Sequence, residues 1–381
     1  MYLMEWGWWW LQRMSAAERE ESDSTTSPRH KHLEKDIYEG DLDSEQHFYS
    51  VSDNPRARGP VFALNDIYME MRCGGLEERR GFITLLFLAG LAPMVHSWAK
   101  ITYSFLYLNI IRLPDFSIVT LTLTIFMLLM GALTAYLYIK YGFRITRLEL
   151  LTSRHLLVRF NRITQQVHLH RPKYCGGIVT FPWKSTGSAA IDPADDALSN
   201  GMRLGLVWHP SRTGLPHMEM ALVGKLGQGG SELRDEWEFI RRYMEDGRES
   251  IPRPRLSTQL PSPIQAFSAQ FEGIGRFVRN SRWPMKLALL LISPIFIIIG
   301  TAHWVSLMLC WRPRWPKIIR EAGIPGKPIP PITTLDDYPP ETQERLLANA
   351  DRYELKPGER PVKKSRARSR RASNAKKVPN Q

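Results

Sequence analysis

Three long stretches without a formal charge constrain this chain of 381 residues more than any other feature. Residues 81–99 and 116–139 lie close together in the first half, and residues 287–311 lie near the end. Because a helix rises about 1.5 Å per residue, roughly 20 apolar residues cross the hydrocarbon layer of a bilayer. The stretches predict an integral membrane protein with a transmembrane helical hairpin over 81–139 and a third membrane segment.

Basic residues on both sides of the hairpin predict its orientation. Arg79 and Arg80 precede it, and Lys140 and Arg144 follow it. Lys and Arg in short flanking segments stay on the cytoplasmic side of a membrane. We therefore expect a multi-pass inner-membrane protein whose N-terminus and following soluble module are both cytoplasmic.

The third segment, 287–311, also has basic residues at both ends. Arg282 precedes it and Arg312 follows it. A single span would place a strongly basic C-terminal tail outside the cell, against the usual charge distribution. We therefore favour a re-entrant segment or tight hairpin, bent near Pro294 or Gly300, over a true span.

Residues 15 to about 58 are polar and charged, and residues 1–58 are predicted to be a disordered N-terminal tail. Residues 59–80 form a short strand or juxtamembrane region, since 61–64 and 67–71 are typical of paired strands. The first residues are rich in tryptophan, which indicates either a misassigned start, with Met14 as the natural one, or an interfacial anchor; these are Trp6, Trp8, Trp9 and Trp10.

Residues 142–250 have the pattern of a β module closed by a helix. Residues 166–170 alternate between apolar and polar in the manner of a half-buried strand. A helix follows from Ser231, and one of its faces is apolar, through Leu233, Trp237, Ile240 and Met244. The predicted fold class is an α+β membrane protein with a cytoplasmic antiparallel module like a pleckstrin-homology (PH) domain and a C-terminal helix; further strands are expected at 156–160, 178–183, 202–208 and 218–223.

The remaining segments are predicted to lie at the membrane surface. Residues 251–286 are a Pro-rich linker and an amphipathic helix, which packs either on the membrane or on the module. Residues 312–381 are a Pro-rich and basic C-terminal tail in a chain of net charge +13. Such a tail attracts anionic membrane lipids. We expect no specific nucleic acid, because the basic run 361–381 has no interleaved aromatic side chains on which bases could stack.

The sequence contains no set of residues that indicates catalysis, a cofactor or a metal. The three cysteines have no metal-ligand spacing, and His168 and His170 have no further ligand at a diagnostic distance in the sequence. The Gly-rich stretch 224–231 lacks the Lys-Ser/Thr pair of a phosphate loop. A turn and helix start explain it better, with a weak contact to anionic lipid through Lys225 as the alternative. We therefore expect a protein that is not an enzyme.

Several short motifs resemble those of an uncharacterised bacterial inner-membrane family with a helical hairpin followed by a PH-like β module. They are Phe160-Asn161-Arg162, residues 167–171, Phe181-Pro182-Trp183 and residues 311–316. Genes of that family often lie beside type VI secretion effectors. The resemblance implies an accessory or immunity-like role, and it supplies no catalytic residue.

The predicted function is that of a non-enzymatic membrane protein whose cytoplasmic module binds a protein partner, either an effector or a secretion component. The candidate partner-binding residues are Phe160, Asn161, Arg162 and Trp183, for which a structural role in the turn and the barrel interior is favoured. The alternative is a membrane sensor or transport component in which His96 lines a path.

Overall fold

The computed structural model describes residues 1–15, 18, 49–76, 79–110, 117–189, 203–227, 230–271, 278 and 281–350. Its centre is an eight-stranded antiparallel sheet in the order β5-β4-β3-β2-β8-β7-β6, with β1 paired to β2. The predicted strands are confirmed within a few residues, and the short β6 had no signal in the sequence. The strands are β1 (Val61–Leu64), β2 (Tyr68–Cys73), β3 (Leu156–Asn161), β4 (Gln166–His170), β5 (Ile178–Pro182), β6 (Gly187–Ala189), β7 (Leu204–Trp208) and β8 (Glu219–Val223).

The apolar hairpin is inserted between two strands that pair with each other. β2 and β3 run antiparallel, and their pairing ends with Cys73 opposite Leu156. The chain leaves the sheet after Cys73, passes through two apolar helices and returns at Leu156. Residues 59–80 and 142–250 were predicted to be separate units, and this is wrong because both contribute to one sheet. Pairing between strands so distant in the sequence leaves no local signal.

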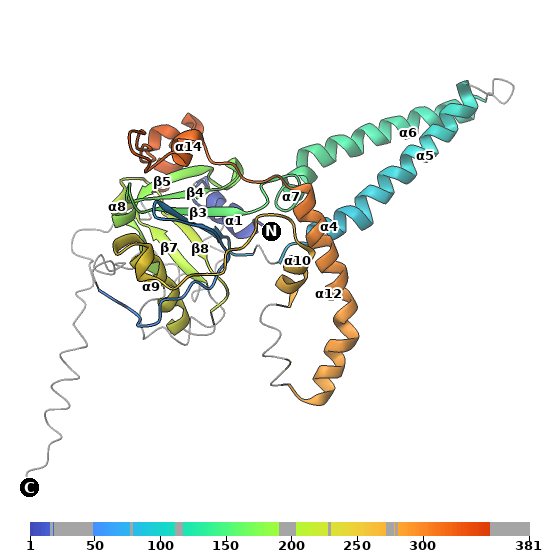
Figure 1. Ribbon diagram of the computed structural model, residues 1–381. Coiled ribbons are helices and arrows are strands. Elements are labelled where there is room, and N and C mark those ends of the chain that lie inside the picture. Colours follow the sequence, from blue (N-terminus) through green and yellow to red (C-terminus); the bar gives the residue numbers. More distant parts are fainter. Residues whose placement is uncertain are drawn as a thin grey trace, which may run out of the picture.

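Helix α9 (Gly230–Glu245) covers one face of the sheet, as Figure 1 shows. The predicted apolar face of this helix is confirmed, since all four of its side chains are buried in the core of the module. Burial of aromatic side chains dominates the energetics of such a core. The four residues are Leu233, Trp237, Ile240 and Met244.

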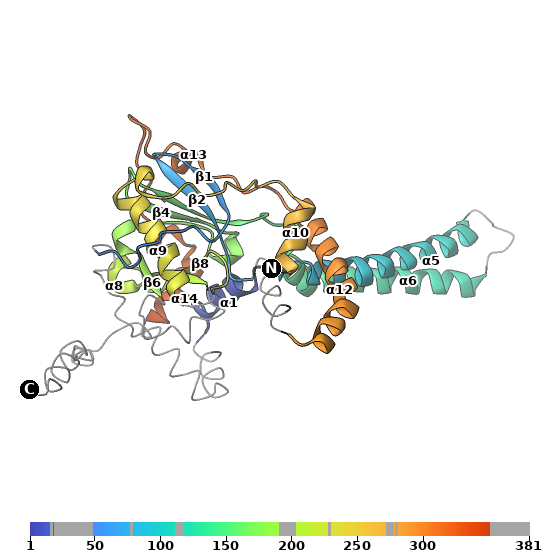
Figure 2. The same cartoon turned by 60° about the horizontal axis from the view of Figure 1, so that its bottom comes forward.

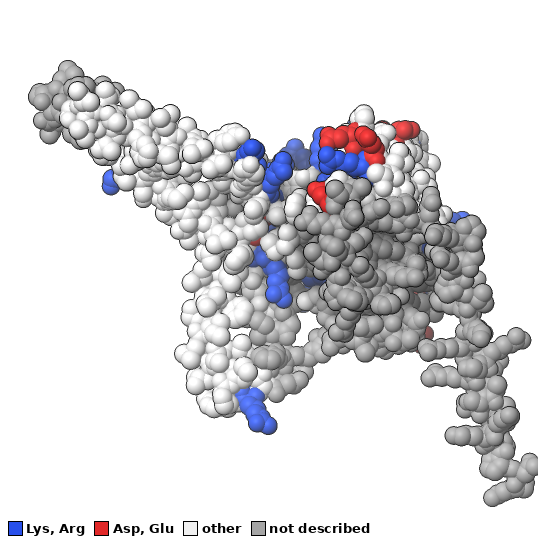
Figure 3. Space-filling view, turned by 180° about the vertical axis from the view of Figure 1, so that it is seen from behind, with Lys and Arg blue, Asp and Glu red and all other residues white. Residues whose placement is uncertain are grey.

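Three helices in the described part of the chain are long and apolar enough to cross a membrane. At most 11% of the apolar window of each is buried in protein, so these surfaces require lipid or another chain to cover them. Figure 3 shows the hairpin and the third apolar helix as almost uncharged surfaces, with Lys and Arg gathered mainly near the module and at the far end of the third helix. The helices are Phe82–Tyr107, Ile118–Thr146 and Trp283–Leu309.

The two helices of the hairpin are longer than predicted. The first comprises α4 (Phe82–Leu86), a π-helical turn and α5 (Ala92–Ile110), so the expected loop after residue 99 is helical up to Ile110. The second comprises α6 (Ile118–Leu137), another π-helical turn and α7 (Phe143–Thr146). Both helices leave the module together and form one arm (Figure 1).

The third apolar segment forms one continuous helix, α12 (Trp283–Leu309), so the predicted tight hairpin within it is wrong. Pro294 lies inside this helix, which is tolerated in apolar helices when neighbouring groups satisfy the backbone. The antiparallel partner of α12 is α10 (Pro263–Gln270), which precedes it. A Cβ added at Gly300 would lie 2.6 Å from Phe267 of α10, which shows how closely the two helices pack.

Glu149, which follows the hairpin, caps the helix with which the hairpin begins. Its buried carboxylate accepts hydrogen bonds from the backbone N–H groups of Gly81, Ile83 and Thr84. A carboxylate is stabilising there because the first N–H groups of a helix lack partners within the helix. Gly81 has a φ of +115°, and a Cβ there would lie 2.5 Å from the carbonyl oxygen of Ile299 in α12. All three apolar helices therefore start or end at one site.

Two arginines complete this polar junction. The buried guanidinium of Arg80 donates to the carbonyl oxygens of Glu149, at 3.1 Å, and Arg154. Arg154 donates to the carbonyl oxygens of Leu307, at 2.9 Å, and Cys310, at 3.0 Å, where α12 ends. Cations stabilise the C-terminal end of a helix, where carbonyl groups lack partners. The β module and the apolar helices are thus connected by buried hydrogen bonds rather than by a simple linker.

The start of the chain is a helix packed on the module, α1 (Leu3–Leu11). The Tyr2 hydroxyl donates to the carbonyl oxygen of Ser153 at 2.6 Å, and the Trp9 ring stacks on Tyr338 with centroids 5.6 Å apart. The predicted disordered tail is therefore wrong for this helix, because its aromatic side chains find buried partners that are distant in the sequence. Most of the residues between 16 and 48 lie outside the described residues.

Residues 312–350 also pack on the module instead of forming a tail. The Trp315 indole donates to the Glu70 carboxylate at 2.7 Å, and the same carboxylate pairs with Arg159 at 2.8 Å. Two short helices follow, α13 (Lys317–Arg320) and α14 (Pro340–Leu347). The basic run predicted to bind lipid, 361–381, lies outside the described residues.

Candidate anion-binding groove

Two of the predicted partner-binding residues lie in the core of the module. Phe160 and Trp183 are fully buried, and their rings meet edge to face with centroids 6.2 Å apart. Trp183 also stacks on Trp237 of α9, and its indole N–H donates to the Glu245 carboxylate at 2.6 Å. The structure brings these two residues together as packing between the sheet and α9.

The other two predicted residues shape the turn between β3 and β4. The Asn161 side chain accepts from the backbone N–H of Thr164 at 3.0 Å and donates to the carbonyl oxygen of Ala322 at 2.9 Å. Arg162 lies partly exposed on the same turn and donates to the carbonyl oxygen of Asp66 at 3.3 Å. These contacts support the structural role that was favoured for both residues.

The histidines of β4 have structural partners. His168 is buried with its Nδ1 2.9 Å from the Thr180 hydroxyl, and burial lowers its pKa to about 3. His170 lies 3.2 Å from the carbonyl oxygen of Arg314, and both histidine rings contact Trp315. Within the described residues no group of His, Cys, Asp and Glu is arranged to hold a metal ion.

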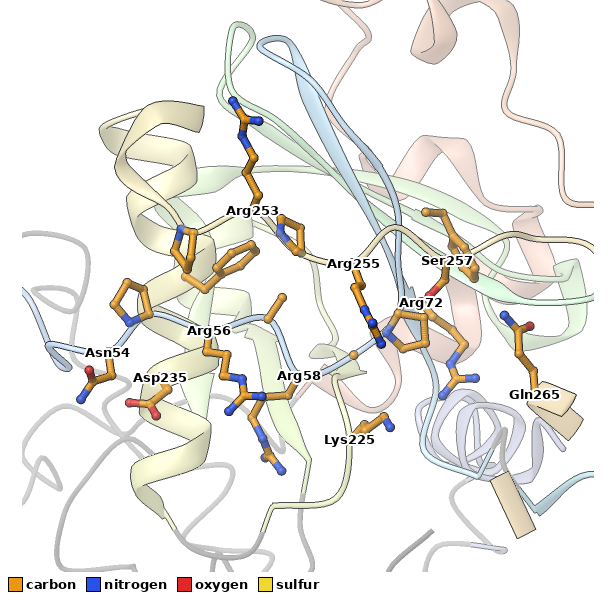
Figure 4. Close-up of a pocket in the computed structure, with 18 of the residues that line it drawn as sticks. Asn54, Arg56, Arg58, Arg72, Lys225, Asp235, Arg253, Arg255, Ser257 and Gln265 are labelled. Carbon is orange, nitrogen blue, oxygen red and sulfur yellow. The ribbon is translucent and has the colours of Figure 1, made fainter. Parts of the chain in front are cut away.

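One feature without a structural explanation is a groove of about 1310 Å³ beside α9. Its walls come from residues 53–60, which precede β1, and residues 252–257, which follow the module, and α10 closes one end (Figure 4). Like charges repel, so a concentration of cations here favours the binding of an anion. Six lining residues are cationic and two are carboxylates: Arg56, Arg58, Arg72, Lys225, Arg253 and Arg255 against Asp53 and Asp235.

The first wall is part of a strap, residues 49–60, that α9 holds in place. Near its start, the Ser50 hydroxyl donates to the Glu238 carboxylate at 2.8 Å. Burial by itself raises the pKa of Glu238, but hydrogen bonds from Arg241 and Arg242 outweigh this effect and lower it to about 2. The carboxylate therefore stays ionised and fixes the strap on the helix at neutral pH.

A second carboxylate of α9 holds the middle of the strap. Glu236 accepts from the backbone N–H groups of Arg58, at 3.3 Å, and Gly59, at 3.2 Å. Its other oxygen is buried and has no hydrogen-bond partner among the described residues. Burial raises the pKa of Glu236 to about 7, although nearby Arg58 opposes the shift. A Cβ at Gly224 would overlap this carboxylate, so only glycine fits there.

The second wall is tied to the sheet, and the end of the groove is tied to an apolar helix. The backbone N–H of Ser257 donates to the carbonyl oxygen of Val61 in β1 at 2.7 Å. Gln265 and Ser268 of α10 line the end of the groove, while Phe267 of the same helix packs on α12. Figure 2 shows α10 between the module and α12.

Several guanidinium groups of the groove lack a carboxylate partner. Among the described residues, Arg56, Arg253 and Arg255 form no ion pair. Arg58 pairs with Glu232 at 2.7 Å, yet its Nη1 is buried without an acceptor in the same part of the chain. In Figure 4 the side chain of Arg255 extends from its wall toward the strap, whereas Arg56 extends from the strap away from that wall and Arg253 turns away from the strap. An unpaired buried donor costs about 1–3 kcal/mol, which a bound anion would offset.

Sequence patterns identified only one residue of this groove, Lys225, and gave it a minor role. A usable signal was the repetition of an Arg-X-Arg pattern beside prolines at 55–58 and 252–255. Each pattern places two cations on a short extended segment, but only the fold brings the two segments together.

Residues 132–324 match the model of a family of unknown function, DUF6708. No curated protein and no solved structure matches the chain.

Proposed function

The chain belongs to the family of unknown function DUF6708, and we propose that it is a membrane-anchored, non-enzymatic binding protein whose β module holds an anionic group in the groove. The observation that carries this proposal is the excess of cations, six against two, around one cavity. Arg forms paired hydrogen bonds to carboxylate and phosphate, so anions of either kind fit these walls.

The non-enzymatic part of the proposal is supported by the roles of the residues that had suggested chemistry. His168 and His170 contact Trp315 and backbone or hydroxyl oxygens in a packed layer. His209 caps α8 (Pro210–Thr213) by accepting from the backbone N–H of Ser211. Side chains with such structural partners are poorly placed to transfer protons to a substrate.

The proposal keeps the PH-like architecture and the cytoplasmic location of the module. The strand order supports the PH-like architecture: β2–β5 form one meander, β6–β8 form a second, and α9 follows β8. Basic residues where the hairpin meets the module, such as Lys140 and Arg144, support the cytoplasmic location of the module.

From the resemblance we further propose an accessory or immunity-like role in the inner membrane of a bacterium, in a type VI secretion context with a protein partner. The alternative, a sensor or transport component, rested on His96 as part of the lining of a path for an ion or ligand. The His96 side chain is exposed on α5, and this position does not support a path between the hairpin helices. The polar junction around Glu149 gives that alternative its only support among the described residues, because it couples the module to the helices.

Photo-crosslinking in cells tests the proposal, because it captures a bound partner whatever its chemical class. A photoreactive amino acid replaces Asn54, which is exposed at the lip of the groove, in the full chain. We expect an adduct that the double substitution Arg56→Gln and Arg255→Gln abolishes. The matched control, Lys173→Gln and Lys184→Gln, removes the same charge from exposed positions outside the groove and should keep the adduct. Absence of any adduct that depends on groove charge would refute the proposal.

A further inference from the structure

We infer that the anionic group in the groove is the phosphate headgroup of an anionic lipid from the membrane that surrounds the apolar helices. The inference rests on the proposed function and specifies its ligand. It follows from the position of the groove, whose walls are cationic and whose end is formed by α10, the helix that packs on the apolar helix α12.

The end of the groove is formed by a helix with two different faces. Gln265 and Ser268 of α10 line the cavity. Phe267 and Phe271 pack instead on α12, with the rings of Phe271 and Phe296 5.5 Å apart. One helix diameter, about 10 Å, therefore separates the polar cavity from an apolar surface.

The apolar surface next to the groove is exposed and available to acyl chains. Ile295, Ile297 and Ile298 of α12 are each at least half exposed, at 53%, 53% and 50%. A ligand with an anionic head and apolar tails would occupy both surfaces at once. An acidic peptide would satisfy the cations and leave this apolar surface uncovered.

The cations are already arranged for a phosphate group. The backbone of the strap is fixed to α9 through Glu236 and Glu238, so Arg56 and Arg58 need little ordering when a ligand binds. Arg255 extends toward the strap from the opposite wall, which is fixed to β1 (Figure 4). Phosphate oxygens can accept from guanidinium groups on both walls. The hydroxyl of Ser268 and the amide of Gln265 could bind the remaining polar atoms of the headgroup.

Native mass spectrometry of the full chain in neutral detergent tests this inference. The probes are phosphatidylglycerol and phosphatidylcholine with identical acyl chains, and glycerol 3-phosphate without acyl chains. We expect phosphatidylglycerol to bind at least tenfold more tightly than either of the other two. Arg56→Gln with Arg255→Gln should weaken its binding about thirtyfold, since each cation near a membrane surface contributes roughly fivefold. The control Lys173→Gln with Lys184→Gln should leave it unchanged.

Three outcomes would overturn the inference. Equal binding of the two lipids would show that the phosphate charge is not recognised. A preference that survives the groove substitutions would place the lipid elsewhere, such as on the basic C-terminal run. Equally tight binding of glycerol 3-phosphate would identify a soluble phosphate as the ligand. A protein adduct at position 54, together with equal lipid binding, would leave the proposed function standing and refute only the lipid.

Discussion

The Thr84 hydroxyl donates to the Glu149 carboxylate over 2.6 Å, and this bond joins the first turn of the first apolar helix to a residue just after the end of the second, at Thr146. Thr84 and Glu149 are both fully buried. The backbone N–H groups around Thr84 donate to the same carboxylate, so the two ends of the hairpin are held at one point. Movement of the hairpin relative to the module would have to break these bonds.

The first prediction concerns this carboxylate. Glu149→Gln replaces one acceptor oxygen by an NH2 group that faces backbone donors. We expect a loss of about 3 kcal/mol in stability, the cost of breaking buried charged hydrogen bonds. Thermal unfolding of the full chain in detergent, followed by tryptophan fluorescence, measures it. Glu341→Gln is the matched control, since Glu341 is exposed in its pair with Arg345. A similar midpoint for both variants would contradict the role assigned to Glu149.

The second prediction concerns the first helix of the chain. Trp9→Ala removes a buried ring that stacks on Tyr338, and such truncations cost about 3–5 kcal/mol. The neighbouring Trp10 is 40% exposed, so Trp10→Ala should have a much smaller effect in the same unfolding experiment. A chain that begins at Met14 lacks α1 and should be as unstable as the Trp9 variant. If this shorter chain unfolds like the full one, α1 is not part of the stable module.

The third prediction separates structure from binding at the predicted site. Asn161→Ala should lower stability by about 1–3 kcal/mol, because it leaves a buried backbone carbonyl and N–H without partners. The adduct formed from position 54 should be unchanged. Arg162→Ala, on the surface of the same turn, should alter stability by less than about 0.5 kcal/mol. Loss of the adduct in a correctly folded Asn161 variant would restore a binding role for this residue.

The fourth prediction is a dependence of stability on pH. The pKa of Glu236 is raised by burial from 4.5 to about 7. The folded protein therefore holds this proton more tightly than the unfolded chain does. The protonated carboxyl group of Glu236 therefore stabilises the folded protein fully below about pH 4.5. This contribution to the free energy of unfolding is lost as the pH rises to about 7, and it is on the order of 3 kcal/mol.

In unfolding experiments between pH 5 and pH 8, Glu236→Gln should remove this decrease of the free energy of unfolding with rising pH. Glu238→Gln is the control, because the lowered pKa of Glu238 lies outside this range. It should lower stability by a similar amount at every pH in the range. If the free energy of unfolding of the Glu236 variant decreases with pH as it does in the unchanged protein, another group is responsible for the pH dependence.

The fifth prediction concerns the side of the membrane on which the chain lies after α12. Because residues 312–350 pack on the sheet, a cysteine in place of Glu341 should share its side with a cysteine in place of Lys184. Labelling of intact cells with an impermeant maleimide, before and after lysis, measures this. Different labelling of the two positions would mean that the packing of α13 and α14 on the module does not persist in the membrane. Protection of both until lysis would support the cytoplasmic module.

Local patterns in the sequence determined the elements of this protein. Lack of charge over a sufficient length identified the three apolar helices, because the cost of placing charge in lipid acts on each residue separately. Alternation identified β4, and the spacing of Leu233, Trp237, Ile240 and Met244 identified the buried face of α9, because strand and helix periods are fixed by the backbone.

Only the tertiary structure decided how these elements combine. The pairing of β2 with β3 across the inserted hairpin depends on contacts between distant residues, which no local pattern records. The same holds for the Trp9 stack on Tyr338, which turns an apparent tail into core. It holds equally for the groove, whose two arginine-bearing walls come from opposite ends of the module. Charge pattern showed that cations were abundant, and the fold decided which of them face one another.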